Sequence, residues 1–320
     1  MKNLKIYNNV CKEEVLNKVQ LSRIHSEYSI GKTLFATSDR GKRAYQEDSV
    51  IVLEHPNASN IKLIAVADGV GSCIDSELAS NHVLKRLIEW FEETTEEDHN
   101  NPLQTKKDLD IMLKTVLKGL QANIYSATTL SAAIVLKEKT IITNIGDSRI
   151  YIVKNDHLKQ PIKDDSEVEK LYRNRGIMNR EIMRFHKYNG IITTAIAYWP
   201  QDYKMNYRVI NNKNYDKILV VTDGVSDCLS TEEIKNIIKT SKAEEITNNI
   251  VAAALNNNSN IEDIIKTLSP KEQQEYIELH EIFEEDYWKT IEGGKDNTTA
   301  AVYIRKWIKI KNKYHYLYRW

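Results

Sequence analysis

The chain has 320 residues, of which 41% are hydrophobic, and its 45 basic side chains balance its 45 acidic ones. This length predicts one large domain with elaborations, and the hydrophobic content is sufficient for a substantial core. Because the formal net charge is zero, no overall field attracts nucleic acid or an anionic membrane, and we expect neither as a partner. No apolar run approaches the roughly 18 residues of a membrane-spanning helix.

The three cysteines, Cys11, Cys73 and Cys228, are odd in number and far apart in the sequence. This spacing argues against a disulfide framework and indicates reduced thiols. The first residues, MKNLKIYNNVCKEEV, interrupt their apolar positions with charge and do not resemble a signal peptide. We therefore expect a cytoplasmic protein.

Residues 1–32 are polar and are predicted to form an N-terminal extension before a domain that spans 33–305. Within this domain, short runs of apolar and β-branched residues predict strands. The runs cover residues 33–38, 49–53, 61–67, 130–136, 140–146, 149–153, 217–223 and 297–304. Periodic patterns predict helices at about 75–93 and 107–125. Two capping boxes, Ser230 with Glu233 and Ser269 with Glu272, open later helices.

Three further segments stand apart from this pattern. Residues 164–200 are mixed and arginine-rich, which predicts an irregular or helical excursion, and residues 270–291 are predicted to form an extra helix. The basic aromatic tail, 306–320, alternates lysine with apolar residues. That pattern also suits binding to nucleic acid or a membrane, but we favour an edge strand protected by its lysines.

The order of the predicted elements indicates the fold class. The strands are clustered and the helices are set apart, without the regular alternation of a parallel sheet. We find no internal repeat and no low-complexity linker, so the chain is not divided further. An α+β fold with antiparallel sheets and helices on their outer faces is expected.

Acidic residues recur beside the ends of the predicted strands. The set comprises Asp68, Asp147 and Asp223, which follow apolar runs, and Asp296, Glu47 and Asp48, which precede strands. Carboxylates at neighbouring strand ends can converge at one edge of a sheet, where they repel each other unless a cation neutralises them. Oxygen ligands without cysteine or histidine favour Mg²⁺ or Mn²⁺ over zinc.

Each Asp-Gly pair taken alone is more often a simple turn signal. The repeated pattern weakens that interpretation, and so does Arg43, which stands near Glu47 and Asp48. A fixed guanidinium group suits a pair of phosphate oxygens. Two cations about 3.5–4 Å apart suit in-line attack on a phosphoryl group.

Five segments contain these residues: SDRGKRAYQED (38–48), VADGVGS (66–72), NIGDSRIYIV (144–153), VTDGVSDCLS (221–230) and GGKDNTTAAVYI (293–304). In content and order they resemble the type 2C family of metal-dependent protein serine/threonine phosphatases, and its bacterial members in particular. The resemblance implies an α-β-β-α sandwich of two antiparallel sheets flanked by helices, with a dimetal site at one end. It also implies that residues 164–200 form the flap beside the active site.

The resemblance implies a role for each site residue and a cofactor of two Mn²⁺ or Mg²⁺ ions. Asp68 would bridge the two ions, the carbonyl of Gly69 would be a further ligand, and Asp223 and Asp296 would complete the first ion's shell. Glu47 and Asp48 would hold metal-bound waters, Arg43 would bind the substrate phosphate, and Asp147 and Asp227 would bind a third, weaker ion.

Some positions depart from the family pattern. Val70 stands where many eukaryotic members have a histidine that can protonate the leaving group, Ser72 where many bacterial members have glycine, and Thr194 where an arginine is usual. The flap has four arginines, Arg173, Arg175, Arg180 and Arg184, which could contact a phosphoprotein or solvate the surface. We favour the second interpretation.

We therefore predict an enzyme that hydrolyses phosphoserine and phosphothreonine with a water activated by two cations. The implied partners are a phosphorylated protein substrate and a cognate serine/threonine kinase. Two alternatives stay open: a non-catalytic signalling module with the same fold, and a phosphatase of a small phosphate ester.

Overall fold

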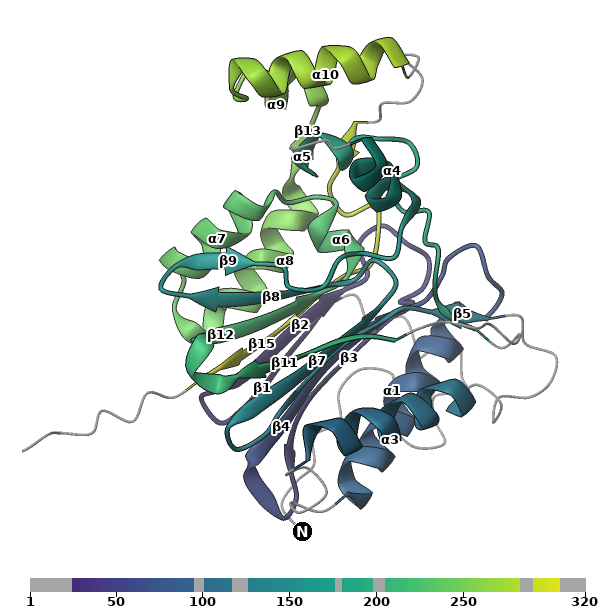
Figure 1. Cartoon of the computed structure of the whole chain (residues 1–320), viewed down its shortest axis with the longest axis vertical. Helices are drawn as coiled ribbons and strands as arrows, with labels where there is room; N and C mark the ends of the chain where they lie inside the picture. The colour runs from purple at the N-terminus through teal and green to yellow at the C-terminus, as the bar shows by residue number, and fades with distance from the viewer. Residues whose placement is uncertain are drawn as a thin grey trace, which may run out of the picture.

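The structure, a computed structural model, describes residues 25–94, 101–116, 126–175, 180–197, 205–282 and 290–305. Within these ranges the chain forms two main antiparallel sheets with helices on both outer faces (Figure 1). The expected α+β fold, an α-β-β-α sandwich, is confirmed. Each helix in the described segments is too short or too polar to cross a lipid bilayer.

The two main sheets have six and five strands, and all their neighbours are antiparallel. The six-stranded sheet has the order β1 (His25–Ile30), β2 (Leu34–Asp39), β15 (Thr298–Ile304), β12 (Lys217–Val221), β8 (Arg149–Lys154), β9 (His157–Lys159). The five-stranded sheet has the order β11 (Asn206–Asn211), β7 (Lys139–Ile145), β6 (Leu130–Val135), β4 (Ala58–Asp68), β3 (Asp48–His55). Two short pairs join β10 (Ile196–Ala197) to β5 (Ala127–Thr128), and β13 (Asn258–Ser259) to β14 (Ile291–Glu292).

The helices fall into groups that cover different parts of the sandwich (Figure 1). The five-stranded sheet is covered by α1 (Ser76–Glu93) and α3 (Pro102–Thr115). The six-stranded sheet is covered by α6 (Asp223–Ser226), α7 (Thr231–Thr240) and α8 (Ile246–Asn256). Beyond one end lie α4 (Glu167–Arg175), α5 (Arg180–Met183), α9 (Ile261–Ile265) and α10 (Pro270–Ile282), while η3 (Asn212–Asn214) and η4 (Ala243–Glu245) are short 3₁₀ turns.

Hydrophobic side chains form three layers, one between the sheets and one beneath each main group of helices. Ile64 of β4 and Ile218 of β12 are fully buried in the layer between the sheets. Leu84 and Leu87, about one turn apart on α1, are fully buried in the layer beneath that helix. Val251 of α8 has the same position on the other side. The helices α1 and α8 therefore attach to the sheets by an apolar face.

The antiparallel register brings the acidic strand ends to one edge of the sandwich. In the five-stranded sheet, Asp48 at the start of β3 is paired directly with Asp68 at the end of β4. In the six-stranded sheet, Val221 at the end of β12 is paired with Ala300 near the start of β15. Side chains that precede or follow these strands therefore meet at the same edge.

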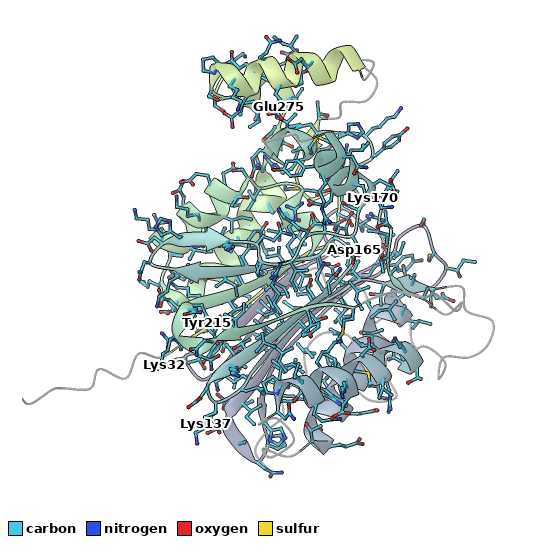
Figure 2. The ribbon with its side chains drawn as sticks, in the orientation of Figure 1. Lys32, Lys137, Asp165, Lys170, Tyr215 and Glu275 are labelled. Carbon is cyan, nitrogen blue, oxygen red and sulfur yellow. The ribbon has the colours of Figure 1, made fainter. Side chains whose placement is uncertain are left out.

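Figure 2 distinguishes the two ends of the sandwich. Lys32, between β1 and β2, and Lys137, between β6 and β7, lie in turns at one end. Asp165 lies toward the other end, below the helix α4. The backbone N–H of Gly146 donates to Asp165, and Gly146 directly precedes Asp147. This second end is therefore the one that contains the acidic strand ends.

Several element boundaries differ from the predicted ones, among them those of β1, α3 and α10. The strand β1 lies in residues assigned to the N-terminal extension and pairs with β2 along its whole length. The helix α3 begins at Pro102 rather than at 107, because the Asn101 side chain accepts bonds from two backbone N–H groups of its first turn. The predicted helix 270–291 is too long, because Ile291 already belongs to the strand β14.

The remaining comparison concerns one strand that was not predicted, the two ends of the chain and the two capping boxes. The strand β11 was missed from the sequence because its residues, NYRVIN, lie at a sheet edge and are mostly half-exposed or exposed, without a long apolar run. Residues 1–24 of the predicted extension and the whole tail, 306–320, lie outside the described residues. Both predicted capping boxes form, at Ser230 with Glu233 and at Ser269 with Glu272.

Replacement of Leu84 by alanine tests the packing of α1. We expect Leu84→Ala to lower the free energy of unfolding by about 2–5 kcal/mol, because it removes a fully buried side chain and leaves a cavity. The matched control is Lys85→Ala at the exposed neighbouring position, with a change of at most about 0.5 kcal/mol. Equal losses in a denaturant titration would contradict this packing.

Candidate metal centre

The acidic strand ends enclose a cavity of about 330 Å³, which we call the acidic cavity. Of the site residues predicted from the sequence, seven line it: Arg43, Asp68, Gly69, Asp147, Asp223, Asp227 and Asp296. Asn189, Gly190 and Ile192 of the segment 164–200 also line it. The structure thus brings together residues from all five sequence segments.

Gly69 lies where three parts of the chain meet at the end of β4. Its backbone N–H donates to the carbonyl of Glu47 at 3.1 Å. A Cβ atom at this position would lie 2.7 Å from the backbone of Ser76 and 3.0 Å from the Glu47 carbonyl oxygen. Only glycine therefore fits between Asp68 and the start of α1.

Asp48 is completely buried and connects the two sheets. The hydroxyl groups of Thr222 and Thr299, which belong to the six-stranded side, donate to its Oδ2 atom at 2.9 and 2.7 Å. Its Oδ1 atom has no hydrogen-bond partner within the described part of the chain. Burial, together with the charges of Asp223 and Asp296, raises the pKa of Asp48 to about 8.

Asp68 and Asp147 show the same electrostatic conflict. Desolvation raises the pKa of Asp68 well above its usual value, and the neighbouring carboxylates of Asp223 and Asp48 add to this shift. Burial likewise raises the pKa of Asp147, with further contributions from Asp223 and Asp227. Such repulsion is relieved by protons or by cations.

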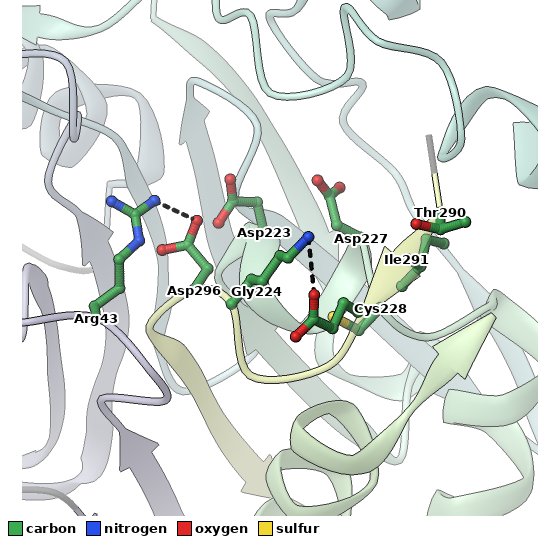
Figure 3. A pocket seen from close by; sticks show the side chains of 10 residues that line it. Arg43, Asp223, Gly224, Asp227, Cys228, Thr290, Ile291 and Asp296 are labelled. Carbon is green, nitrogen blue, oxygen red and sulfur yellow. Dashed lines mark hydrogen bonds and ion pairs between the residues drawn. The ribbon is translucent and has the colours of Figure 1, made fainter. Parts of the chain in front are cut away.

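Arg43 provides a positive charge at the edge of this cluster. Its guanidinium group contacts Asp296 at 2.8 Å and Glu47 at 3.4 Å, and Figure 3 shows it facing Asp296. Partial burial opposes the charge on Arg43, but the carboxylates of Asp296, Glu47 and Asp223 outweigh it and raise its pKa. Glu47 is itself held by a hydrogen bond from the hydroxyl of Ser76.

Asn297 has a structural role that the sequence analysis did not assign. Its side-chain NH₂ group donates to the carbonyls of Arg40 and Tyr45 at 2.9 and 3.0 Å, and its Oδ1 atom accepts from the backbone N–H of Glu47 at 2.7 Å. This buried amide therefore fixes the loop that presents Arg43. The segment GGKDN contained the signal, because Asn297 directly follows a predicted ligand.

Arg184 corrects the prediction that the arginines of the segment 164–200 solvate a surface. Its side chain is 3% exposed, lies 3.0 Å from Glu181 and donates to the backbone carbonyl of Asp227 at 3.2 Å. It therefore packs beneath the acidic cavity. Arg173 is exposed and pairs with Glu169, while the side chains of Arg175 and Arg180 lie outside the described residues.

Ser72 lines the acidic cavity and is exposed, and it does not cap the next helix. Asp75 is the N-cap residue of α1 and has a left-handed backbone conformation, with a φ of 53°. The hydroxyl group of Ser76 donates to Glu47 instead of to the helix. Thr194 is half-buried beside the strand β10.

The donor atoms of the cavity suit hard divalent cations. They are carboxylate oxygens, with one buried oxygen of Asp48 unpartnered and with pKa values raised by mutual repulsion. In the described ranges, no three acidic, cysteine or histidine side chains already form a group that could hold a metal ion. The carboxylates are gathered at one edge, while Asp296 pairs with Arg43.

Acidic side chains with a guanidinium group, at one edge of an α-β-β-α sandwich, define the class of enzymes that handle phosphate groups with the help of cations. The family model for protein phosphatase 2C matches residues 37–268. The serine/threonine phosphatase stp of Listeria welshimeri is 28% identical over 218 residues, which cover 64% of this chain and 82% of the relative.

Solved structures show the same fold. The serine/threonine phosphatase Stp1 of Staphylococcus aureus superimposes with a TM-score of 0.64 at 22% identity, over 88% of this chain and 98% of that one. The catalytic domain of the phosphatase PstP, solved with two manganese ions, has a TM-score of 0.59 at 20% identity, over 85% of this chain and 96% of that one. The chain belongs to the protein phosphatase 2C family. It is a serine/threonine protein phosphatase of the bacterial type.

The raised pKa of Asp48 predicts how the stability of the protein without divalent cations depends on pH. Between the usual carboxyl pKa, about 4, and about 8, the folded state keeps a proton that the unfolded state has released. The free energy of unfolding in the presence of a chelator should therefore fall as the pH rises from about 5 to about 8. Asp48→Asn should weaken this dependence, and a flat or rising profile in the unsubstituted protein would contradict it.

The role of Asn297 predicts a loss of stability on its replacement. Asn297→Ala leaves two carbonyls and one N–H group without their bonds, so we expect the free energy of unfolding to fall by about 2 kcal/mol or more. Asn236→Ala, at an exposed position of α7, is the matched control, with a change within about 0.5 kcal/mol. The same small loss in both variants, measured by chemical denaturation, would argue against this role.

Proposed function

We propose that the acidic cavity is a dimetal centre for hydrolysis of phosphoserine and phosphothreonine. Asp68 would contact both ions, the carbonyl of Gly69 would be a further ligand, Asp223 and Asp296 would bind the first ion, and Glu47 and Asp48 would act through water. Asp147 and Asp227 would hold a third, weaker ion. The observation that supports this proposal is the gathering of these carboxylates around one cavity beside Arg43.

Arg43 is the group that binds the phosphate in this proposal. Asp296 pairs with the guanidinium group in this structure, and as a cation ligand it would leave that group available to the phosphate. Arg43 then offers two parallel N–H donors to a pair of phosphate oxygens. Glu47, held by Ser76, keeps the guanidinium group oriented toward the cavity.

When bound, two Mn²⁺ or Mg²⁺ ions would activate a water near neutral pH and offset the negative charge of the phosphoryl group. Arg43 stabilises the charge that develops on those oxygens during in-line attack. Val70 lines the same cavity and has no proton to donate, so the leaving alkoxide takes its proton from water.

The described cysteines do not suit a covalent mechanism. Burial, followed by the charges of Asp227 and Asp223, raises the pKa of Cys228 to about 11. Burial also raises the pKa of Cys73. Because the thiolate is the nucleophilic form, both thiols are poor nucleophiles at neutral pH. Direct attack by water is therefore the proposed route.

The substrate in this proposal is a phosphorylated protein, and a serine/threonine kinase is the expected opposing enzyme. Support comes from two relatives that are serine/threonine phosphatases, stp of Listeria welshimeri and Stp1 of Staphylococcus aureus. The choice of Mn²⁺ is supported by the PstP structure with two manganese ions. A cytoplasmic location stays a prediction from the sequence.

Replacement of two carboxylates tests the dimetal proposal. Asp68→Ala and Asp223→Asn should each lower Mn²⁺-dependent hydrolysis of a phosphothreonine peptide by at least about a thousandfold, because the nucleophile is lost. Asp156→Asn, in the exposed turn between β8 and β9, is the matched control and should keep full activity. Calorimetric titration with Mn²⁺ should show weaker binding in the first two variants only.

Unchanged turnover in either site variant would overturn the assignment of these ligands. Hydrolysis of a small phosphate ester without hydrolysis of any phosphopeptide would instead favour the alternative substrate class. A folded protein that binds no Mn²⁺ and hydrolyses neither substrate would point to a non-catalytic module.

A further inference from the structure

A second cavity of about 800 Å³ opens beside the acidic cavity, and we call it the flanking pocket. Four residues line both cavities: Arg43, Asp223, Asp227 and Asp296. The remaining lining residues are Gly224, Cys228, Thr290, Ile291, Glu292 and Lys295. Figure 3 shows Arg43 and Asp296 at one side of this pocket, with Cys228, Thr290 and Ile291 at the other. The pocket has the size of a typical ligand site.

The far wall of the pocket is built by the strand β14 and the turn that follows it. Glu292 and Ile291 pair with residues of β13, which anchors the wall in a short sheet. A Cβ atom on Gly293 would lie 2.6–2.7 Å from three backbone carbonyls at the end of α8. The backbone N–H of Lys42 donates to the Gly294 carbonyl at 2.6 Å. The loops that contain Lys42 and Lys295 are therefore fixed against each other.

Three charged side chains form a cluster, of which Glu292 and Lys295 line the flanking pocket and Lys42 contacts Glu292. The Nζ atom of Lys42 lies 2.6 Å from one carboxylate oxygen of Glu292, and the Nζ atom of Lys295 lies 3.0 Å from the other. The lysine side chains are 62% and 64% exposed, so solvent and solutes reach them. Two ammonium groups thus hold one carboxylate, and the cluster has an excess of one positive charge.

Each lysine directly precedes a residue of the acidic cavity in the chain. Lys42 precedes Arg43, and Lys295 precedes Asp296. A phosphate group bound by Arg43 would lie at the boundary between the two cavities, because Arg43 lines both. The acidic cavity is occupied by carboxylates, so the larger flanking pocket is the space for the rest of the substrate.

We propose that the flanking pocket receives a residue adjacent to the phosphorylated one, and that Lys42 and Lys295 select an acidic side chain there. This inference rests on the proposed binding of phosphate at Arg43. In the free enzyme Glu292 occupies the position of the substrate carboxylate and competes with it for the two lysines. The buried Ile291 contributes an apolar surface for the aliphatic part of the side chain.

The aspartates of the pocket lining would favour a basic neighbour only in the absence of cations. Asp223, Asp227 and Asp296 face both cavities and, without cations, would attract a basic residue. In the active enzyme these carboxylates are engaged with divalent cations, which leaves the lysines as the dominant charge at the rim. A preference for a basic neighbour is therefore the opposite outcome of the test.

The test measures kcat/KM of the Mn²⁺-loaded enzyme on phosphothreonine peptides that differ only in the residues next to the phosphothreonine, with Glu, Gln or Lys there. The unsubstituted enzyme should prefer Glu to Gln by about threefold, as expected for an exposed ion pair. Glu292→Gln should increase this preference, because it removes the competing carboxylate. Lys42→Glu and Lys295→Glu should each reverse it.

The control variant is Lys85→Glu, which makes the same charge change on an exposed position of α1 and should leave the preference unchanged. Hydrolysis of a small phosphate ester should be similar in all these variants, because none of the substituted residues belongs to the dimetal centre. Two results would overturn this inference alone. One is that the ratios of kcat/KM among the Glu, Gln and Lys peptides are the same in every variant, and the other is that the enzyme prefers the Lys peptide. No Mn²⁺-dependent hydrolysis of any substrate by the unsubstituted enzyme would overturn the proposed dimetal function as well.

Discussion

The carboxylate of Asp48 carries the constraint on which the site depends. One of its oxygens accepts hydroxyl bonds from Thr222 and Thr299 and so joins the two sheets, while the other has no hydrogen-bond partner in the described residues. A completely buried carboxylate with one unsatisfied oxygen is costly unless a proton or a cation compensates it. The same burial raises its pKa to about 8. The fold therefore holds mutually repelling carboxylates at this edge, a conflict that bound divalent cations would relieve.

Close backbone packing keeps these carboxylates near each other. Gly69 leaves no room for a side chain between Ser76 and Glu47, and a Cβ atom on Gly224 would lie 2.0 Å from the carbonyl oxygen of Asn297. Asn297 in turn fixes the loop that presents Arg43 through three hydrogen bonds. The carboxylates cannot move apart to relieve their repulsion, since each is attached to a strand end or to a loop fixed in this way. A preorganised cluster of this kind lowers the reorganisation needed when ligands bind.

The sequence indicated which acidic residues gather at one edge because the signals are local. Asp68 and Asp223 precede a glycine and Asp147 follows one, each at the end of an apolar run, and Asp296 precedes an asparagine, so these patterns are visible without coordinates. Arg184 was interpreted as a surface charge because nothing in its neighbours indicates burial; its environment comes from Glu181 and from the distant carbonyl of Asp227. The strands β1 and β11 were missed for a related reason, because edge strands are stabilised by a partner rather than by their own apolar content.

The sequence by itself determined the fold class, the main strands, the capping boxes and the identity of the residues gathered at the acidic edge. These features depend on interactions within a few residues, such as alternation, caps and strand-end turns. Only the tertiary structure decided that Asn297 holds the Arg43 loop and that Lys42, Glu292 and Lys295 form one cluster beside the site. The contacts of Asn297 with the Arg43 loop and of Lys42 with Glu292 join positions about 250 residues apart. The pairing register of the sheets, which sequence spacing does not specify, brings these positions together.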